Sequence, residues 1–125
     1  MTLMNSLPID INIKGRSSKF YSSVKGRTLT LLKSAKRRDI NSELDFDYLY
    51  NKLLKNKCEV TGILFDLNKN NKWKKNPYSP SIDRINNKIG YTKENTRIVI
   101  WQYNLMKGEL TDSELLDICK ILTNK

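Results

Sequence analysis

Two oxygen-bearing side chains in the second half of the chain could hold a metal ion together. Asp83 lies in the segment SIDRI, and Asn104 lies in the later segment WQYNLMK. Mg²⁺ prefers oxygen ligands and often takes only one or two from the protein, with water and substrate phosphate completing the octahedron. A cation held in this way polarises a phosphodiester and neutralises the charge that develops during cleavage. Taken alone, the pair leaves a simpler alternative open, an ordinary salt bridge between Asp83 and its neighbour Arg84.

The composition excludes several other kinds of site. The 125 residues include no His, so Ser-His-Asp, Cys-His and histidine-dependent metal sites are all impossible. The two cysteines, Cys58 and Cys119, are too few for a disulfide framework or a four-ligand zinc site. We therefore expect free thiols in a reducing cytoplasm and no structural zinc. No run of 18 apolar residues and no signal peptide is visible, so we expect no membrane partner.

The positive charge is concentrated in two stretches of the chain. The formal net charge is +10, and the stretch from Lys14 to Arg38 contains nine basic residues and no acidic one. The stretch from Lys69 to Lys75 contains four lysines and again no acid. Such clustering favours a nucleic-acid partner, although a Lys- and Asn-rich composition with a solvated face is the alternative. Candidate contacts to the nucleic-acid backbone in these stretches are Lys19, Lys25, Arg27, Lys33, Lys36, Arg37, Arg38, Lys72, Lys74 and Lys75.

One aromatic residue, Trp73, stands among the lysines of the second stretch. A basic loop with an aromatic side chain can follow a backbone and stack on a base. The alternative is that Trp73 packs on the core, since large aromatic side chains gain much from burial.

Helices are expected before and after a central region of short strands. The pattern of apolar residues predicts a helix over 19–38, mostly basic on its outer side. A second helix is expected from an N-cap at Asp45 or Asp47 to about residue 56. A last helix should follow Thr111, because Thr111 and Glu114 have the spacing of a capping box.

The central region is expected to carry the strands. Residues 58–67 are short and apolar and favour a strand or a hairpin with a turn at Thr61 and Gly62. Residues 81–85 alternate like a half-buried strand, and residues 96–100 form a second strand candidate. The residues from 101 to 107 contain no helix breaker until Gly108, which predicts a short helix directly after the second strand.

The motifs of this region resemble those of the HNH endonuclease superfamily, the ββα-metal or His-Me finger nucleases. The similar members are small phage and mobile-element proteins with a C-x-x-T-G start, then S-x-D-R-I, G-Y-T-x-E-N-x-R-x-V and N-x-x-K. In this chain the same motifs occur in this order between Cys58 and Lys107. Each motif is a weak signal alone, and their order makes the resemblance specific.

The resemblance implies a fold and a function. The fold would be α+β in a single domain, 1–125. A basic helical part, 1–57, would precede a ββα-metal core, 58–107, and a C-terminal helix, 108–125, would follow it. The function would be cleavage or nicking of double-stranded DNA with Mg²⁺ or Mn²⁺, in the host cytoplasm if a phage encodes the protein. The alternative is a catalytically inactive HNH-like protein that binds nucleic acid.

The resemblance also implies a role for each matching residue. Asp83 would be the metal ligand of the first strand and Asn104 the metal ligand of the helix. Asn95 would tie the loop between the strands through backbone hydrogen bonds, and Arg84 would contact the scissile region. These four residues make up the expected catalytic set. Two further basic residues would lie near the phosphate backbone, Arg97 and Lys107.

The general base of the family is missing from this chain. A His usually follows the first metal ligand directly or lies three residues after it, and here these positions hold Arg84 and Asn86. Neither Arg nor an amide can act as a base at ordinary pH. Three explanations remain open: attack by metal-bound hydroxide or with help from the substrate phosphate, a carboxylate such as Glu94 or Glu59 brought close by the fold, or loss of catalysis.

Overall fold

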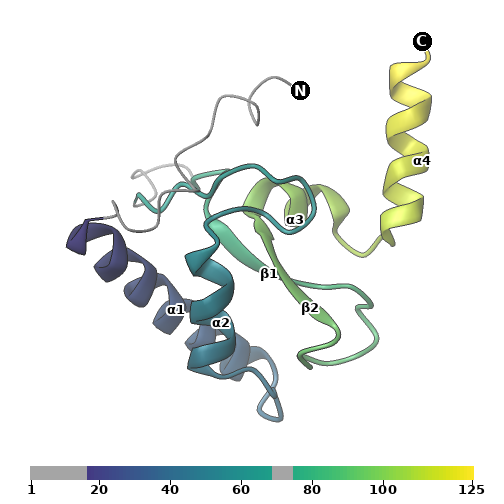
Figure 1. Ribbon diagram of the computed structural model, residues 1–125. Helices are drawn as coiled ribbons and strands as arrows, with labels where there is room; N and C mark the ends of the chain where they lie inside the picture. Colours follow the sequence, from purple (N-terminus) through teal and green to yellow (C-terminus); the bar gives the residue numbers. More distant parts are fainter. Residues whose placement is uncertain (1–16, 69–74) are drawn as a thin grey trace.

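The fold is α+β. The computed structural model describes residues 17–68 and 75–125, and this part contains four helices and one two-stranded antiparallel sheet (Figure 1). The order along the chain is α1 (Ser18–Arg38), α2 (Phe46–Leu54), β1 (Pro80–Arg84), β2 (Thr96–Ile100), α3 (Trp101–Lys107) and α4 (Asp112–Thr123). The predicted order of helices and strands is confirmed except at residues 58–67.

Local capping explains where the helices begin. The side chain of Ser17 accepts a hydrogen bond from the backbone N–H of Phe20 at the start of α1. Asp45, one of the two predicted caps, does the same for Tyr48 at the start of α2. The predicted capping box at α4 is present in full, with reciprocal bonds between Thr111 and Glu114.

The region 58–67 differs from the expectation, because it contains no strand. A single isolated bridge joins Lys57 to Leu64 around a turn in which Gly62 has φ +76°. The second helix also ends earlier than predicted, at Leu54. The chain leaves it with Asn56 in the left-handed region, at φ +59°, which ends helical hydrogen bonding there.

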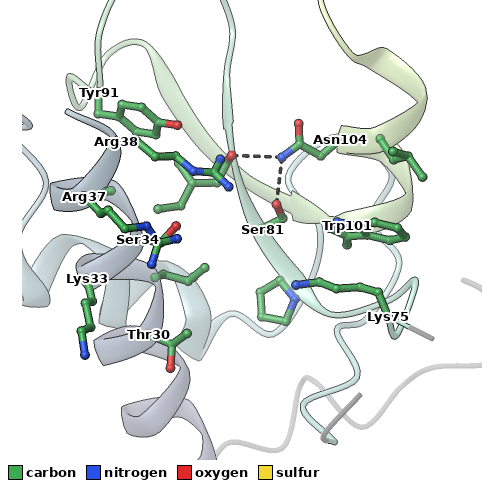
Figure 2. A pocket seen from close by; sticks show the side chains of 15 residues that line it. Thr30, Lys33, Ser34, Arg37, Arg38, Lys75, Ser81, Tyr91, Trp101 and Asn104 are labelled. Carbon is green, nitrogen blue, oxygen red and sulfur yellow. Dashed lines mark hydrogen bonds between the residues drawn. The ribbon is translucent and has the colours of Figure 1, made fainter. Parts of the chain in front are cut away.

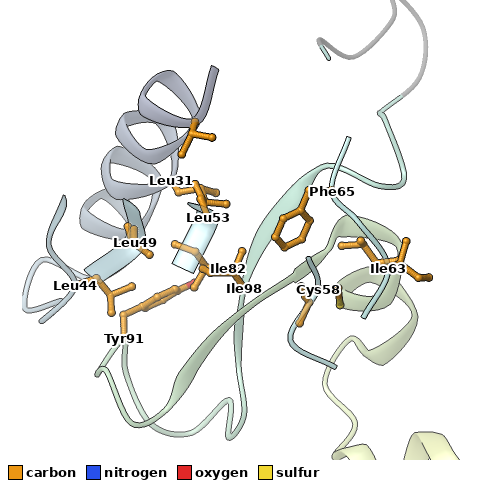
Figure 3. Packing of buried hydrophobic residues seen from close by; sticks show 14 residues of the cluster. Leu31, Leu44, Leu49, Leu53, Cys58, Ile63, Phe65, Ile82, Tyr91 and Ile98 are labelled. Atoms are coloured by element: carbon orange, nitrogen blue, oxygen red, sulfur yellow. The ribbon is translucent and has the colours of Figure 1, made fainter. Parts of the chain in front are cut away.

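The sheet has an apolar face and a second, polar face, which carries charged side chains beside the buried Val99. Successive side chains of a strand point to opposite faces, and the register pairs Ile82 with Ile98 and Asp83 with Arg97. Ile82 and Ile98 are buried in a cluster with Leu31 of α1 and Leu53 of α2, as Figure 3 shows. Asp83 and Arg97 project from the other face, toward α3.

The C-terminal helix extends away from the rest of the molecule. Figure 1 shows α1 and α2 beside the sheet, α3 directly after β2, and α4 pointing outward from the end of α3. Leu115 is the buried residue of α4, while the remaining apolar side chains of this helix are half-buried or exposed. The core therefore lies among α1, α2, the sheet and residues 58–65.

Candidate functional site

The polar face of the sheet and helix α3 form a seam. Helix α3 begins at the residue after β2 and crosses back over β1. Two of its side chains, one turn apart, reach β1. Asn104 donates its amide hydrogens to Ser81 Oγ at 2.8 Å and to the carbonyl of Ile82 at 3.0 Å, and Lys107 reaches Asp83. The strand–helix order thus brings the two expected metal ligands, Asp83 and Asn104, to the same seam.

Both oxygens of the Asp83 carboxylate are occupied by cationic side chains of the protein. Lys107 Nζ lies 3.2 Å from Oδ1, and Arg97 Nε lies 2.8 Å from Oδ2. The Lys107 side chain is 0% exposed and that of Asp83 only 2%. Lys107 also donates to the carbonyl of Arg84 at 2.9 Å. A buried ion needs a partner charge and hydrogen bonds to offset its desolvation, and these contacts provide both.

The network continues from Arg97 to the start of α4. The guanidinium of Arg97 makes two bonds to the Asp112 carboxylate, at 2.6 and 2.8 Å, in the fork geometry that suits an Arg–carboxylate pair. Tyr103 donates its hydroxyl to the same carboxylate at 2.6 Å. Hydrogen bonds from Arg97, joined by that of Tyr103, lower the pKa of Asp112 to about 2. Burial, together with the bond to Asp112, raises the pKa of Tyr103 to about 12.

This arrangement does not fit a divalent cation as it stands. Two protein cations already neutralise Asp83. The hydrogen bonds of Asn104 to β1 use its amide nitrogen and not the side-chain oxygen, which is the atom that would bind a metal, so the mismatch lies at Asp83. No group of three or more His, Cys, Asp or Glu side chains with metal-site geometry occurs in residues 17–68 and 75–125.

Asn95 ties the loop between the strands, in the way that the sequence predicts. Its amide nitrogen donates to the carbonyls of Asn86, Ile89 and Gly90 at 3.0 to 3.1 Å. Its side-chain oxygen accepts from the N–H of Asn86 at 3.0 Å. The residue is 7% exposed, so it faces the loop interior and fixes the connection that aligns β1 with β2.

A groove lies beside the seam, between α1 and the β1–α3 unit. It has a volume of about 550 Å³. Figure 2 shows Arg37 and Arg38 extending into it from α1 and Lys75 from the opposite wall. Among the described residues, four basic side chains and no acidic one line it. They are Lys33, Arg37 and Arg38 of α1 and Lys75 before β1. A second hollow, of about 660 Å³ beside the 85–88 loop, has Glu109 and Glu114 in its lining and suits a polyanion less well.

The floor of the groove is polar and partly aromatic. Ser81 and Asn104 lie there side by side, and Trp101 stands near Lys75, whose Nζ is 6.0 Å from the ring centroid (Figure 2). A half-buried indole next to cations can stack on a base or sugar while the cations contact phosphate. The chemistry of this lining suits a phosphate backbone.

The other predicted nucleic-acid contacts are placed differently. Arg27 donates to the carbonyls of Leu67 and Asn68, and burial lowers its pKa. Lys36 donates to the carbonyl of Ser42. Lys19 and Lys25 are exposed outside the groove, and Lys72, Lys74 and Trp73 lie outside the described residues.

Two of the predicted phosphate contacts lie in the seam, where Lys107 is buried and Arg97 is mostly covered, and this differs from the expectation. Lys107 has no exposed side-chain surface and Arg97 has 15%, and each is bonded to carboxylates. Their positive charges therefore neutralise carboxylates of the same chain and do not face solvent. The spacing of the motif placed them near Asp83 without indicating whether they would face it or face solvent.

The residue in place of the usual base, Arg84, lies over an aromatic ring. The Arg84 guanidinium lies 5.1 Å from the centroid of the Tyr91 ring. Of the carboxylates considered as substitutes, Glu59 pairs with Lys52 at 2.9 Å and accepts from the N–H of Ile98. Glu94 is exposed.

Sequence reasoning missed three residues that matter here. Asp112 and Tyr103 complete the network from Asp83, and Trp101 forms part of the groove. Asp112 lies between the two residues of the predicted capping box, Thr111 and Glu114, and no sequence pattern pairs it with Arg97. For Trp101 the sequence offered one indication. It is the first residue of the short predicted helix that also carries Asn104, so the two side chains were expected to lie close together.

Comparison with known proteins gives a phage relative. The chain is 34% identical over 84 residues to an uncharacterized 29.0 kDa protein from the dda-modA intergenic region of Enterobacteria phage T4. The match covers 67% of this chain and 32% of the phage protein, so the chain spans about a third of the length of that relative. No protein-family model and no solved structure matches the chain. No helix among the described residues is long and apolar enough to span a membrane.

Proposed function

We propose that the protein binds nucleic acid, with double-stranded DNA as its partner, along the groove between α1 and the β1–α3 unit. The observation that carries the proposal is the lining of this groove by Lys33, Arg37, Arg38 and Lys75, with no acidic side chain from residues 17–68 and 75–125. A net charge of +10 attracts a polyanion from any direction, whereas a hollow with convergent cations gives it a place to bind. Contacts to phosphate position the backbone and carry little sequence information.

The salt dependence of binding follows from the number of phosphates contacted. If the four basic side chains of the groove each neutralise one phosphate, log K should fall against log salt with a slope of about −3 to −4. This corresponds to a loss of roughly 50-fold in affinity between about 0.1 and 0.3 M salt.

The experiment compares two double variants with the same change in charge. Arg37→Gln/Arg38→Gln removes two cations from the groove, and Lys25→Gln/Lys55→Gln removes two exposed cations outside it. Fluorescence anisotropy with a labelled duplex should show weaker binding and a slope lower by about 2 for the groove variant. The control should lose much less affinity. Equal losses in the two variants would mean that net charge, and not the groove, determines binding.

Metal-dependent nicking of DNA is the second candidate, in line with the resemblance to HNH nucleases. It is supported by the β1–β2–α3 order, which places Asp83 and Asn104 on one seam beside the groove. Bound Mg²⁺ would supply charge neutralisation at the scissile phosphate. The pairing of Asp83 with Lys107 and Arg97 argues against it, because a divalent cation would have to displace them.

Supercoiled plasmid separates the two candidates. The protein is incubated with plasmid in Mg²⁺, in Mn²⁺ and in EDTA, beside Asn104→Ala, which leaves the buried ion pairs intact. Nicking in a divalent cation that is lost in the variant, with binding retained, would establish the nuclease. Gel shifts without nicking in any ion would leave binding as the function.

A further inference from the structure

The two walls of the basic groove differ in their chemistry. The wall from α1 presents three cationic side chains, Lys33, Arg37 and Arg38. The wall from α3 presents an aromatic and an apolar side chain, Trp101 and Leu105, which lie one helical turn apart on the same side of that helix. Figure 2 shows the basic side chains of α1 and the ring of Trp101 on opposite sides of the hollow. A ligand that matches both walls carries negative charge along one edge and flat, apolar surface along the other.

The ring of Trp101 is available to such a ligand. Among the described residues, Tyr103 of the same helix packs against the hydrophobic core cluster, and Trp101 does not. The indole is half-buried in the groove wall, and Leu105 beside it is 57% exposed. A large aromatic ring contributes most when other apolar surface covers it. A base stacked on Trp101 would provide that cover.

A double helix does not offer the faces of its bases to a protein. They are covered by stacking, so a duplex is contacted at its phosphates and at the base edges in its grooves. An unpaired strand exposes the base faces, and proteins bind such strands with aromatic side chains beside a basic track. The groove volume of about 550 Å³ also lies in the range of pockets that enclose a small molecule, about 300 to 1,000 Å³. The hollow therefore suits a nucleotide or two of a single strand in both size and chemistry.

We propose that the groove takes an unpaired stretch of DNA that extends from a duplex, with one base stacked on Trp101 and the adjoining phosphates against Arg37 and Arg38. This inference rests on the proposed function, because the same cations of α1 contact phosphate in both. On a blunt duplex they contact the backbone at the mouth of the groove, and Trp101 meets no base. Where a strand is unpaired it enters the hollow, and Lys75, whose Nζ lies 6.0 Å from the centroid of the indole ring, adds a cation beside the stacked base.

Fluorescence anisotropy with two labelled DNAs that carry the same number of phosphates tests the proposal. One is a blunt duplex, and the other is a shorter duplex with a single-stranded extension. The wild type should bind the extended DNA about 5- to 100-fold more tightly, which is the effect of stacking one base. Charge alone predicts no such preference, because a single strand releases fewer counterions for each phosphate contacted. Equal affinity of the wild type for the two DNAs would overturn the proposal.

Two variants of Trp101 separate stacking from a structural role. Trp101→Leu should lose the preference for the extended DNA and keep the wild-type affinity for the blunt duplex, which also verifies its fold. Trp101→Phe retains an aromatic ring and should keep part of the preference. Equal losses of Trp101→Leu on the two DNAs, or an unchanged preference, would overturn the proposal.

The fluorescence of Trp101 gives a second measurement on a protein with its groove intact. In a Trp73→Phe background, Trp101 is the remaining tryptophan of the chain. The extended DNA should quench its emission over the same concentration range as the anisotropy change, because the base stacks on the ring. The blunt duplex should leave the emission unchanged. Equal quenching by both DNAs, or none by the extended one, would overturn the proposal.

The failure of this inference can be distinguished from the failure of the proposed function. Both DNAs are also tested with Arg37→Gln/Arg38→Gln and with Lys25→Gln/Lys55→Gln. Equal affinity of the wild type for both DNAs, with a selective loss in the arginine variant, would overturn the unpaired-strand inference and leave the groove as a duplex-binding surface. Equal losses in the two double variants on both DNAs would overturn the proposed function and this inference with it.

Discussion

The ammonium of Lys107 and the carboxylate of Asp83 form an ion pair in the interior of the protein, 3.2 Å apart and with 0% and 2% of their side chains exposed. Arg97 closes the other side of the carboxylate. In this chain the expected metal ligand of the first strand is therefore part of the structure that joins β1, β2 and α3. A substitution of Asp83 is therefore expected to lower the stability of the fold, whatever its effect on a reaction.

Asp83→Ala should destabilise the fold strongly. It leaves Lys107 buried without its counter-charge, and breaking a buried pair from one side costs about 3 to 5 kcal/mol. The double variant Asp83→Ala/Lys107→Met should recover much of this loss, because it removes both charges and keeps an apolar chain of similar length. Urea denaturation of the wild type, both single variants and the double variant measures the coupling. Additive losses would show that the two side chains do not depend on each other.

Asn95→Asp should destabilise the loop between the strands. The amide nitrogen that serves three carbonyls is replaced by an oxygen, which accepts hydrogen bonds and repels those carbonyls. We expect a loss of at least about 2 to 3 kcal/mol, the cost of leaving buried polar groups unsatisfied. Asn87→Asp, in the same loop but bonded only to the Gly108 carbonyl at 3.2 Å, is the matched control. Thermal denaturation of both variants tests this prediction: Asn95→Asp should lower Tm more than Asn87→Asp does. Equal shifts in Tm would contradict the role assigned to Asn95.

Acid should weaken the attachment of α4. Asp112 has a pKa of about 2 in the folded chain, lowered from 3.8 mainly by Arg97. Because the folded-state pKa is the lower one, the stabilisation is complete above the unfolded value and is lost as pH falls from about 4 to 2. Its size is limited to about 1 kcal/mol, since the carboxylate is partly open to solvent.

Urea denaturation of the wild type and Asp112→Asn from pH 7 to pH 2 measures this contribution. The difference in unfolding free energy between the two proteins should be constant down to about pH 4 and should then shrink. A difference that stays the same down to pH 2 would mean that Asp112 does not act through its charge.

Tyr103 should be the tyrosine whose ionisation is delayed by the network. Its pKa is raised from 10.0 to about 12, by burial and then by the hydrogen bond to Asp112. A raised folded-state pKa gives stabilisation that is present below about pH 10 and is lost as pH rises toward 12. An absorbance titration of tyrosinate should show a late component near pH 12, and Tyr103→Phe should remove it. If Tyr103→Phe instead removed a component that titrates near pH 10, the Tyr103 hydroxyl would be exposed to solvent and not held by the network.

The sequence alone determined the order and most boundaries of the elements. The capping box at Thr111, the stop at Gly108 and the alternation of residues 96–100 are local signals, since each depends on hydrogen bonds or side-chain directions within a few residues. The prediction of a strand or hairpin at residues 58–67 was wrong because it used local sequence alone. In the folded protein this apolar segment packs into the core as a turn with a single bridge.

The partners of the charged side chains were decided by the tertiary structure. The sequence placed Asp83, Arg97 and Lys107 in the right motifs, but the strand register set Arg97 opposite Asp83, and the return of α3 over β1 buried Lys107 against it. The groove likewise exists only because α1 packs beside the β1–α3 unit. Charge in a sequence has no direction, and only packing decides whether a cation meets solvent, a phosphate or a carboxylate of its own chain.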